Sequence, residues 1–330
     1  MTEMPRASTP TPDSVRSHIL EAENRELKGE LKAMKKDMAH MSGSLVRHVK
    51  SKLKMQLKPA PKGARRRGDI VRVVFGDTHG AKINQAAASA FLGDVKRLDP
   101  HEIIMLGDHI DCGGFLAQHH VMGFVAETAT SYEDDVAAAN HFIDALQKAA
   151  PKATIKYIEG NHDRRIETWA VTQTLRHQRD AEMLRRAFAP EYLLHLKERG
   201  IKYYRQSEFY DGLPVPGTIK LGKCFFWHGT SSAKHTTAAN IAKVAGNIVF
   251  GHVHRAQSLS IRPVATGEIG AWCPGCLCEL APLWQHTNPN DWTHGYGVQL
   301  IATSENFLHL NIPIIEGASL LMPLTTRIVK

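Results

Sequence analysis

Residues 70–80 read Ile-Val-Arg-Val-Val-Phe-Gly-Asp-Thr-His-Gly, and this stretch decides the fold. Its first six residues are β-branched or apolar apart from one arginine, which is typical of a buried strand. A glycine ends the apolar run, and Asp77 and His79 follow it closely. The polar side chains thus come where a strand ends, which is where ligands bind in open α/β sheets. The stretch predicts an α/β domain with its site at the strand ends.

The same arrangement recurs along the chain. Apolar runs at 102–106, 154–158, 224–227 and 247–250 predict four more buried strands, and each precedes a polar cluster. The clusters are Gly107-Asp108-His109-Ile110-Asp111, Gly160-Asn161-His162-Asp163, His228-Gly229 and Gly251-His252-Val253-His254. A helical pattern at about 164–200 predicts an insertion. After His254 the pattern changes to strands without helices, ending at 297–302 and 307–312, and predicts a second sheet packed on the first.

The residue types in these clusters indicate metal chemistry. Carboxylate, imidazole and amide oxygen form a mixed nitrogen and oxygen ligand set, suited to Mn, Fe, Zn or similar divalent ions. Two such ions about 3.5–4 Å apart can clamp a phosphoryl group and activate a water. Glycines beside the ligands let backbone and substrate approach closely. The clusters predict a two-metal site that acts on phosphate esters.

The ordered series of motifs resembles the calcineurin-like metallophosphoesterases, whose pattern runs D-x-H, G-D-x-x-D, G-N-H-[DE], H and G-H-x-H. The resemblance covers roughly residues 71–275. Each motif alone is weak, but five in the correct order, each after an expected strand, are specific. The resemblance implies an α/β fold, a four-layer αββα sandwich of two mixed sheets, to which the sequence adds an N-terminal helix.

The resemblance also implies roles for individual residues. The first metal would be held by Asp77, His79 and His254, with Asp108 bridging, and the second by Asp108, Asn161, His228 and His252. His162 matches the family histidine that stabilises the transition state or protonates the leaving oxygen. Asp111 matches the carboxylate that orients this imidazole. The expected cofactor is a pair of divalent ions, manganese first, with iron, zinc or nickel as alternatives.

Other residues near the motifs carry weaker expectations. Arg164, Arg165 and Arg255 each follow a metal motif, and we expect Arg164 to contact the substrate phosphate. The alternative is an ordinary salt-bridged surface arginine. His109 is expected to be exposed near the mouth of the site.

Two further segments stand out. The run Cys273-Pro274-Gly275-Cys276-Leu277-Cys278 could be read as a zinc knuckle, but the second pair of ligands that a structural zinc site needs is missing. It matches instead an N-P-G-S turn of the family. Cys112 replaces an arginine of the protein phosphatase branch, and Asp163 replaces the glutamate of its third motif, which argues against a protein phosphatase.

The N-terminal part has a different character. We expect a disordered tail at 1–16, a helix at 17–53, a basic linker at 54–68 and the catalytic domain at 69–330. Within 20–45 the helix places apolar residues at heptad spacing, which predicts a homo-oligomeric coiled coil. The alternative is one amphipathic helix lying on its own domain. The core positions are Leu20, Asn24, Leu27, Leu31, Met34, Met38, Met41 and Leu45.

Charge separates the two parts. Residues 1–67 hold 16 Lys or Arg against 7 Asp or Glu, whereas residues 68–330 hold 25 against 26. A basic segment of this kind binds polyanions. The leading hypothesis is therefore a phosphodiesterase that acts on DNA, a nuclease resembling double-strand-break repair nucleases and phage-encoded members; the resemblance to the latter extends loosely to 272–278 and 292–295.

Alternative hypotheses remain. The nearly neutral catalytic body favours a phosphatase or cyclic-nucleotide phosphodiesterase with a small substrate. A structural protein working through its coiled coil is a third hypothesis, against which the complete ligand set argues. The sequence shows no membrane span and no signal peptide, and its five cysteines fit a reducing compartment, so we expect a cytoplasmic protein, in the host cytoplasm if phage-encoded.

Overall fold

The computed structural model describes residues 69–111, 131–174, 178–231, 233–282 and 290–321. All of them belong to Gly63–Lys330, one of the two units into which the chain divides. The predicted tail, the coiled coil at 17–53 and the linker at 54–68 lie outside the described residues and stay predictions. None of the described helices is long and apolar enough to cross a membrane.

The larger sheet has seven strands in the order β12-β11-β10-β1-β2-β3-β4. Strands β1 to β4 run parallel to one another, and β10, β11 and β12 extend the sheet by antiparallel pairing. The strands are β1 (Ile70–Phe75), β2 (Glu102–Met105), β3 (Thr154–Ile158), β4 (Lys202–Tyr204), β10 (Gly295–Ile301), β11 (Phe307–Ile315) and β12 (Ala318–Ser319).

The smaller sheet has five strands in the order β5-β6-β7-β9-β8. Strands β6, β7 and β9 are parallel neighbours, and β5 and β8 are antiparallel edge strands. The strands are β5 (Ile219–Leu221), β6 (Cys224–Trp227), β7 (Asn247–Phe250), β8 (Ala256–Ile261) and β9 (Ile269–Pro274).

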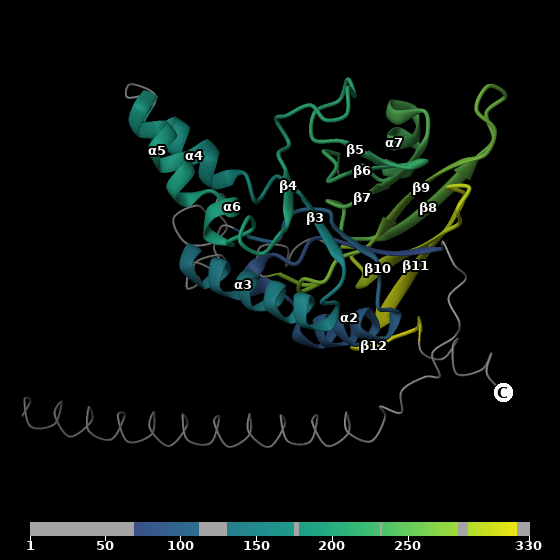
Figure 1. Cartoon of the computed structure of the whole chain (residues 1–330), viewed down its shortest axis with the longest axis horizontal. Helices are drawn as coiled ribbons and strands as arrows, with labels where there is room; N and C mark the ends of the chain where they lie inside the picture. Colours follow the sequence, from purple (N-terminus) through teal and green to yellow (C-terminus); the bar gives the residue numbers. More distant parts are fainter. Residues whose placement is uncertain (1–68, 112–130, 175–177, 232, 283–289, 322–330) are drawn as a thin grey trace, which may run out of the picture. The chain divides into compact units, whose positions relative to one another are not determined.

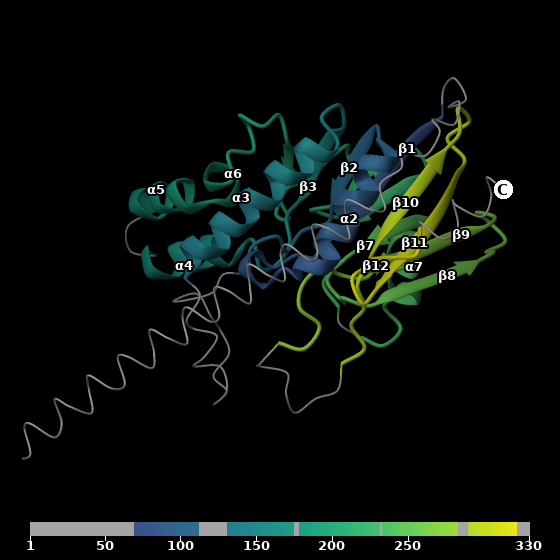
Figure 2. The ribbon, with the colours of Figure 1, turned by 90° about the horizontal axis from the view of Figure 1, so that it is seen from below.

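Helices cover the outer faces of the two sheets (Figure 1). Helices α2 and α3 lie against the larger sheet, and α7 lies against the smaller one. Figure 2 shows α4, α5 and α6, which fall within the expected insertion, at the end of the domain away from β10 and β11. The helical elements are η1 (Gly80–Lys82), α2 (Gln85–Leu98), α3 (Tyr132–Ala149), α4 (Arg165–Thr174), α5 (Gln178–Phe188), α6 (Pro190–Leu193) and α7 (Thr236–Val244).

Three clusters of buried residues fill the spaces between these layers. Alternation along β1 separates the first two, because neighbouring side chains of a strand point to opposite faces. Val73 and Phe75 pack with Phe91 of α2, whereas Val74 packs between the sheets with Phe226. The third cluster lies between the smaller sheet and α7. This confirms the four-layer αββα sandwich of two mixed sheets.

The strands after His254 do not form a second sheet by themselves, so that expectation was wrong. Only β8 and β9 join the smaller sheet, whose other strands β5, β6 and β7 precede His254. Strand β10 pairs along the length of β1, and β11 pairs with β10. The chain crosses back because the larger sheet has a free edge at β1, and antiparallel pairing there satisfies its backbone groups.

Candidate metal centre

The polar clusters meet where β1, β2, β3, β6 and β7 end. Five residues of these turns have left-handed backbone, with φ of 52–73°; they are Asp77, His79, Asp108, His252 and His254. Asp and His tolerate this region better than most side chains do, although it carries a modest energetic cost. Gly107, at φ 101°, approaches the turn after β3 closely, because an added Cβ would lie 2.6 Å from the Gly160 nitrogen.

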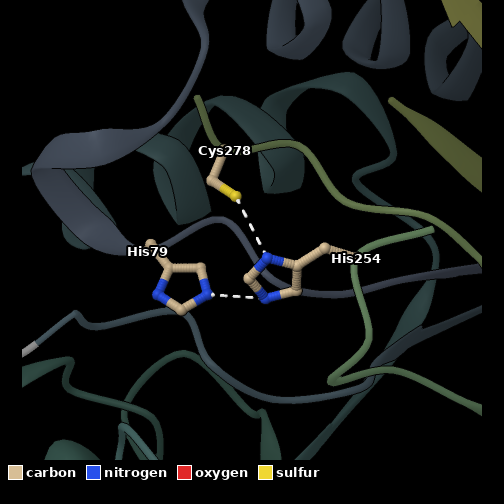
Figure 3. Close-up of side chains that lie close together, drawn as sticks. All are labelled: His79, His254 and Cys278. Atoms are coloured by element: carbon tan, nitrogen blue, oxygen red, sulfur yellow. Dashed lines mark hydrogen bonds between the residues drawn. The ribbon is translucent and has the colours of Figure 1, made fainter. Parts of the chain in front are cut away.

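One half of the centre joins the first and last clusters. His254 Nε2 lies 3.2 Å from Asp77 Oδ1 and 3.1 Å from His79 Nε2. Figure 3 shows the two imidazoles directed at each other. Asp77, His79, Asp108 and His254 together form a buried group whose ligand atoms lie within 4.8 Å of one another.

The other half shares Asp108 with the first. His228 Nε2 lies 3.1 Å from Asp108 Oδ2 and 3.0 Å from Asn161 Oδ1. The same Asn161 oxygen lies 2.8 Å from His252 Nδ1. Asp108, His228 and His252 form a second group that could hold an ion. The structure thus brings together all seven predicted ligands around Asp108.

Other groups fix the outward-facing nitrogens of these histidines. His228 Nδ1 donates to the Leu106 carbonyl oxygen at 2.7 Å. Asp111 Oδ1 lies 2.8 Å from His79 Nδ1 and 3.1 Å from His162 Nδ1. One carboxylate therefore holds both a predicted ligand and the predicted catalytic histidine, whereas only the second contact was expected.

Asp163 is the residue whose role the sequence did not reveal. Its side chain is fully buried and accepts hydrogen bonds from four backbone N–H groups. They are those of Asp108, His109, Ile110 and Gly160, at 2.9–3.1 Å. Asp163 therefore ties the turn after β2 to the turn after β3. In the sequence, only its position at the end of the Gly160–Asp163 motif indicated that Asp163 lies near the site.

The charges of the centre depend on each other. Burial alone would raise the pKa of Asp77 and Asp108, but neighbouring histidines overcome it and hold both values below the usual range. Burial opposes protonation of both His79 and His228, but a neighbouring carboxylate outweighs it in each case. Asp111 raises the pKa of His79 to about 9, and Asp108 raises the pKa of His228 to about 9. Burial lowers the pKa of His252 to about 4. The carboxylates are thus ionised at neutral pH.

This donor set fits divalent metal ions. Two ionised carboxylates, an amide oxygen and four imidazoles converge in a buried volume, and this mixture of nitrogen and oxygen donors suits Mn, Fe, Zn or Ni. His79 Nε2 and His254 Nε2 face each other at 3.1 Å, an arrangement in which both could bind the same cation. Buried charges of this kind occur where they are paired or coordinate metals.

The arginines near the centre differ in their contacts. Arg165 Nη2 donates to His162 Nε2 at 2.9 Å, and its Nη1 donates to the Asp111 carbonyl oxygen at 3.1 Å. Arg164 is exposed, and Arg255 pairs with Asp291. No observation tests the substrate role of Arg164, which stays a prediction, but Arg165 is the arginine that touches His162.

His109 is not exposed at the mouth of the site, and that expectation was wrong. Its side chain is 1% exposed, and Nδ1 lies 2.8 Å from Thr78 Oγ1. The ring packs edge-on against Phe75 and Tyr157. Burial lowers the pKa of His109 to about 3, so it stays neutral and acts as part of the core.

The chain is similar to a known protein family and to several solved structures. A family profile described as calcineurin-like phosphoesterase matches residues 71–247. No curated protein matches the chain. One similar solved structure is wild-type Vps29 complexed with zinc from Entamoeba histolytica, at 12% sequence identity and a TM-score of 0.38. The alignment covers 76% of this chain and 96% of that one. Another is the YfcE phosphoesterase from E. coli, at 18% identity and TM-score 0.32, covering 73% and 99%.

The family match spans more than half of the chain and includes four of the five motifs, and the fifth, Gly251-His252-Val253-His254, completes the same cluster in space. The chain therefore belongs to the calcineurin-like phosphoesterases, metal-dependent enzymes that hydrolyse phosphate esters.

Proposed function

We propose that this chain is a two-metal phosphodiesterase that cleaves DNA. The observation that carries the reaction class is the buried cluster in which Asp108 belongs to both ligand groups. In the proposed assignment Asp77, His79 and His254 would hold one ion, Asn161, His228 and His252 would hold the other, and Asp108 would contribute to both. We propose manganese as the resident metal. When bound, the two ions polarise the phosphoryl oxygens and supply an activated water.

His162 and its neighbours act on the leaving group in this proposal. Because Arg165 donates to Nε2, His162 accepts there and donates from Nδ1 to Asp111. Nε2 therefore carries no proton in this arrangement. In the proposed reaction Nε2 takes up a proton and Arg165 turns to a phosphate oxygen before His162 protonates the leaving oxygen. Arg165 lies where it can meet a phosphate oxygen bound next to His162, and a guanidinium matches the geometry of phosphate well.

The substrate class rests on charge. The excess of Lys and Arg lies in residues 1–67, and such a segment gains affinity for DNA by releasing counterions. A second candidate is a phosphatase or cyclic-nucleotide phosphodiesterase with a small substrate. The nearly neutral balance of residues 68–330 favours it, because a nuclease groove usually has its own positive lining.

A panel of three substrates separates the candidates. The purified full chain, supplemented with Mn²⁺, is assayed on a diester dye, a monoester dye and linear DNA. Cleavage of DNA and of the diester dye is expected. Turnover of the monoester dye alone would overturn the nuclease assignment and leave the small-substrate phosphatase.

The metal assignment has its own test. Replacing Asp108 by Asn removes the shared carboxylate, so we expect the variant to lose both ions or nearly both. Elemental analysis after gel filtration measures this directly, with the exposed Asp211→Asn variant as the matched control. Two ions still bound to Asp108→Asn would show that Asp108 is not shared.

A further inference from the structure

Two segments that stood out in the sequence meet in the structure. The Cys276 nitrogen donates to the Thr293 carbonyl at 2.9 Å, and the Gly295 nitrogen donates to the Cys276 carbonyl at 3.1 Å. The His294 ring donates from Nε2 to the Cys278 carbonyl at 2.8 Å. The cysteine segment and the segment at 292–295 thus form one unit, although neither has a part in the proposed reaction.

This unit surrounds His254. The Thr293 nitrogen donates to the His254 carbonyl at 2.8 Å, and the Trp292 ring centroid lies 4.0 Å from that of the imidazole. Cys278 Sγ lies 3.9 Å from His254 Nδ1, whereas Nε2 of the same ring faces His79 (Figure 3). Backbone, ring face and outer nitrogen of His254 are therefore all held by this unit.

The position of Cys278 is itself fixed. Residue 278 forms a bridge with Ile83, and the preceding Leu277 nitrogen donates to the Asp77 carbonyl at 3.2 Å. The thiol is 2% exposed.

The outer nitrogens of the other histidines show what such a partner does. His79 Nδ1 meets the Asp111 carboxylate, and His228 Nδ1 meets the Leu106 carbonyl. A metal-ligating histidine usually donates its second ring N–H in this way, which fixes the tautomer and leaves the other nitrogen able to ligate. At His254 the corresponding place is taken by a sulfur, a weak acceptor.

We propose that Cys278 is the positioning residue of His254. Its sulfur accepts from Nδ1–H and so keeps the Nε2 lone pair available for the ion that Asp77 and His79 would also hold. This inference rests on the proposed role of His254 as a ligand. Its consequence is that the affinity of the first metal depends on a thiol that lies against the outer nitrogen of a ligand.

The test compares Cys278→Ala and Cys278→Ser with Cys224→Ala. Cys224 is an equally buried thiol in the core between the sheets, so it controls for the loss of a buried sulfur. The first readout is solvent exchange of the His254 Nδ1–H, followed by ¹⁵N-resolved NMR in full-length protein loaded with diamagnetic Zn²⁺. We expect slow exchange in wild type, Cys278→Ser and Cys224→Ala, and faster exchange in Cys278→Ala.

The second readout is Mn²⁺ affinity, measured by competition with a chromophoric chelator. Removing the hydrogen-bond partner of a ligating histidine typically weakens metal binding about 10–100-fold. Because sulfur is a weak acceptor, we expect Cys278→Ala to weaken Mn²⁺ binding by about tenfold, the low end of that range. The serine variant keeps an acceptor and should recover most of the affinity. Wild-type exchange and wild-type affinity in Cys278→Ala would overturn the inference. A wild-type chain that binds no divalent ion would instead overturn the proposed function on which the inference rests.

Discussion

At the scale of single residues, the proposed mechanism assigns metal binding and assistance to the leaving oxygen to different side chains. His162 contacts Asp111 and Arg165, and its backbone nitrogen donates to Asp108 Oδ1 at 2.8 Å. Replacing it by Gln should leave the metals bound and lower turnover of a diester dye about 10²–10⁴-fold, the usual contribution of a general acid. Elemental analysis and kcat of the variant measure both effects. An unchanged rate would move the proton-transfer role to another group.

Protonation of two ligands should make metal binding depend on pH. The carboxylates raise the pKa of His79 and His228 to about 9 in the metal-free protein, from 6.5, so both rings carry a proton at neutral pH. Metal must displace these protons, and we expect its apparent affinity to rise about tenfold per pH unit for each proton displaced, up to pH 9. Calorimetry in buffers of different ionisation enthalpy counts the released protons.

The same raised pKa values make the stability of the metal-free chain fall as pH rises, whereas metal affinity increases. The pKa values of His79 and His228 are higher in the folded chain than in the unfolded chain. The stability that these two protonated rings contribute is therefore complete below pH 6.5 and is lost as pH rises through about 9. Denaturant unfolding with a chelator present measures it. A metal affinity that is flat between pH 7 and 9 would contradict both statements.

At the scale of elements, Asp163 connects two strands through their turns. Replacing it by Asn puts an amide NH₂ among four backbone N–H donors, and each buried donor left without an acceptor costs about 1–3 kcal/mol. We expect Asp163→Asn to lower the free energy of unfolding by about 3 kcal/mol or more and to weaken metal binding through Asp108. The exposed Asp211→Asn variant should change stability by less than about 0.5 kcal/mol. Equal unfolding midpoints would remove this role from Asp163.

At the scale of the whole molecule, the basic N-terminal segment distinguishes the two proposed substrate classes. Deleting residues 1–60 should weaken DNA binding and flatten the slope of log affinity against log salt, because that segment holds most of the excess positive charge. Hydrolysis of a diester dye should hardly change, since the centre lies beyond residue 70. Binding isotherms at several salt concentrations test this. Equal DNA cleavage by both forms at every salt concentration would remove the segment from substrate binding.

The sequence by itself determined the strands that carry the site and the order of their ligands. Both signals are local: an apolar run such as 70–75 defines a strand, and the polar cluster after it lies at the strand end in any α/β arrangement. The family pattern then supplied the ligand set, which the structure brings together around Asp108.

The tertiary structure alone decided what depends on contacts between distant segments. Three such features join residues far apart in the chain. They are the pairing of β10 with β1, the burial of His109, and the contacts of Cys278 and Trp292 with His254. The same holds for Asp163, which resembles any other acidic residue until four backbone donors from two turns converge on it. Such contacts arise from packing between elements, and the periodicity of a single sequence carries no record of which elements will be neighbours.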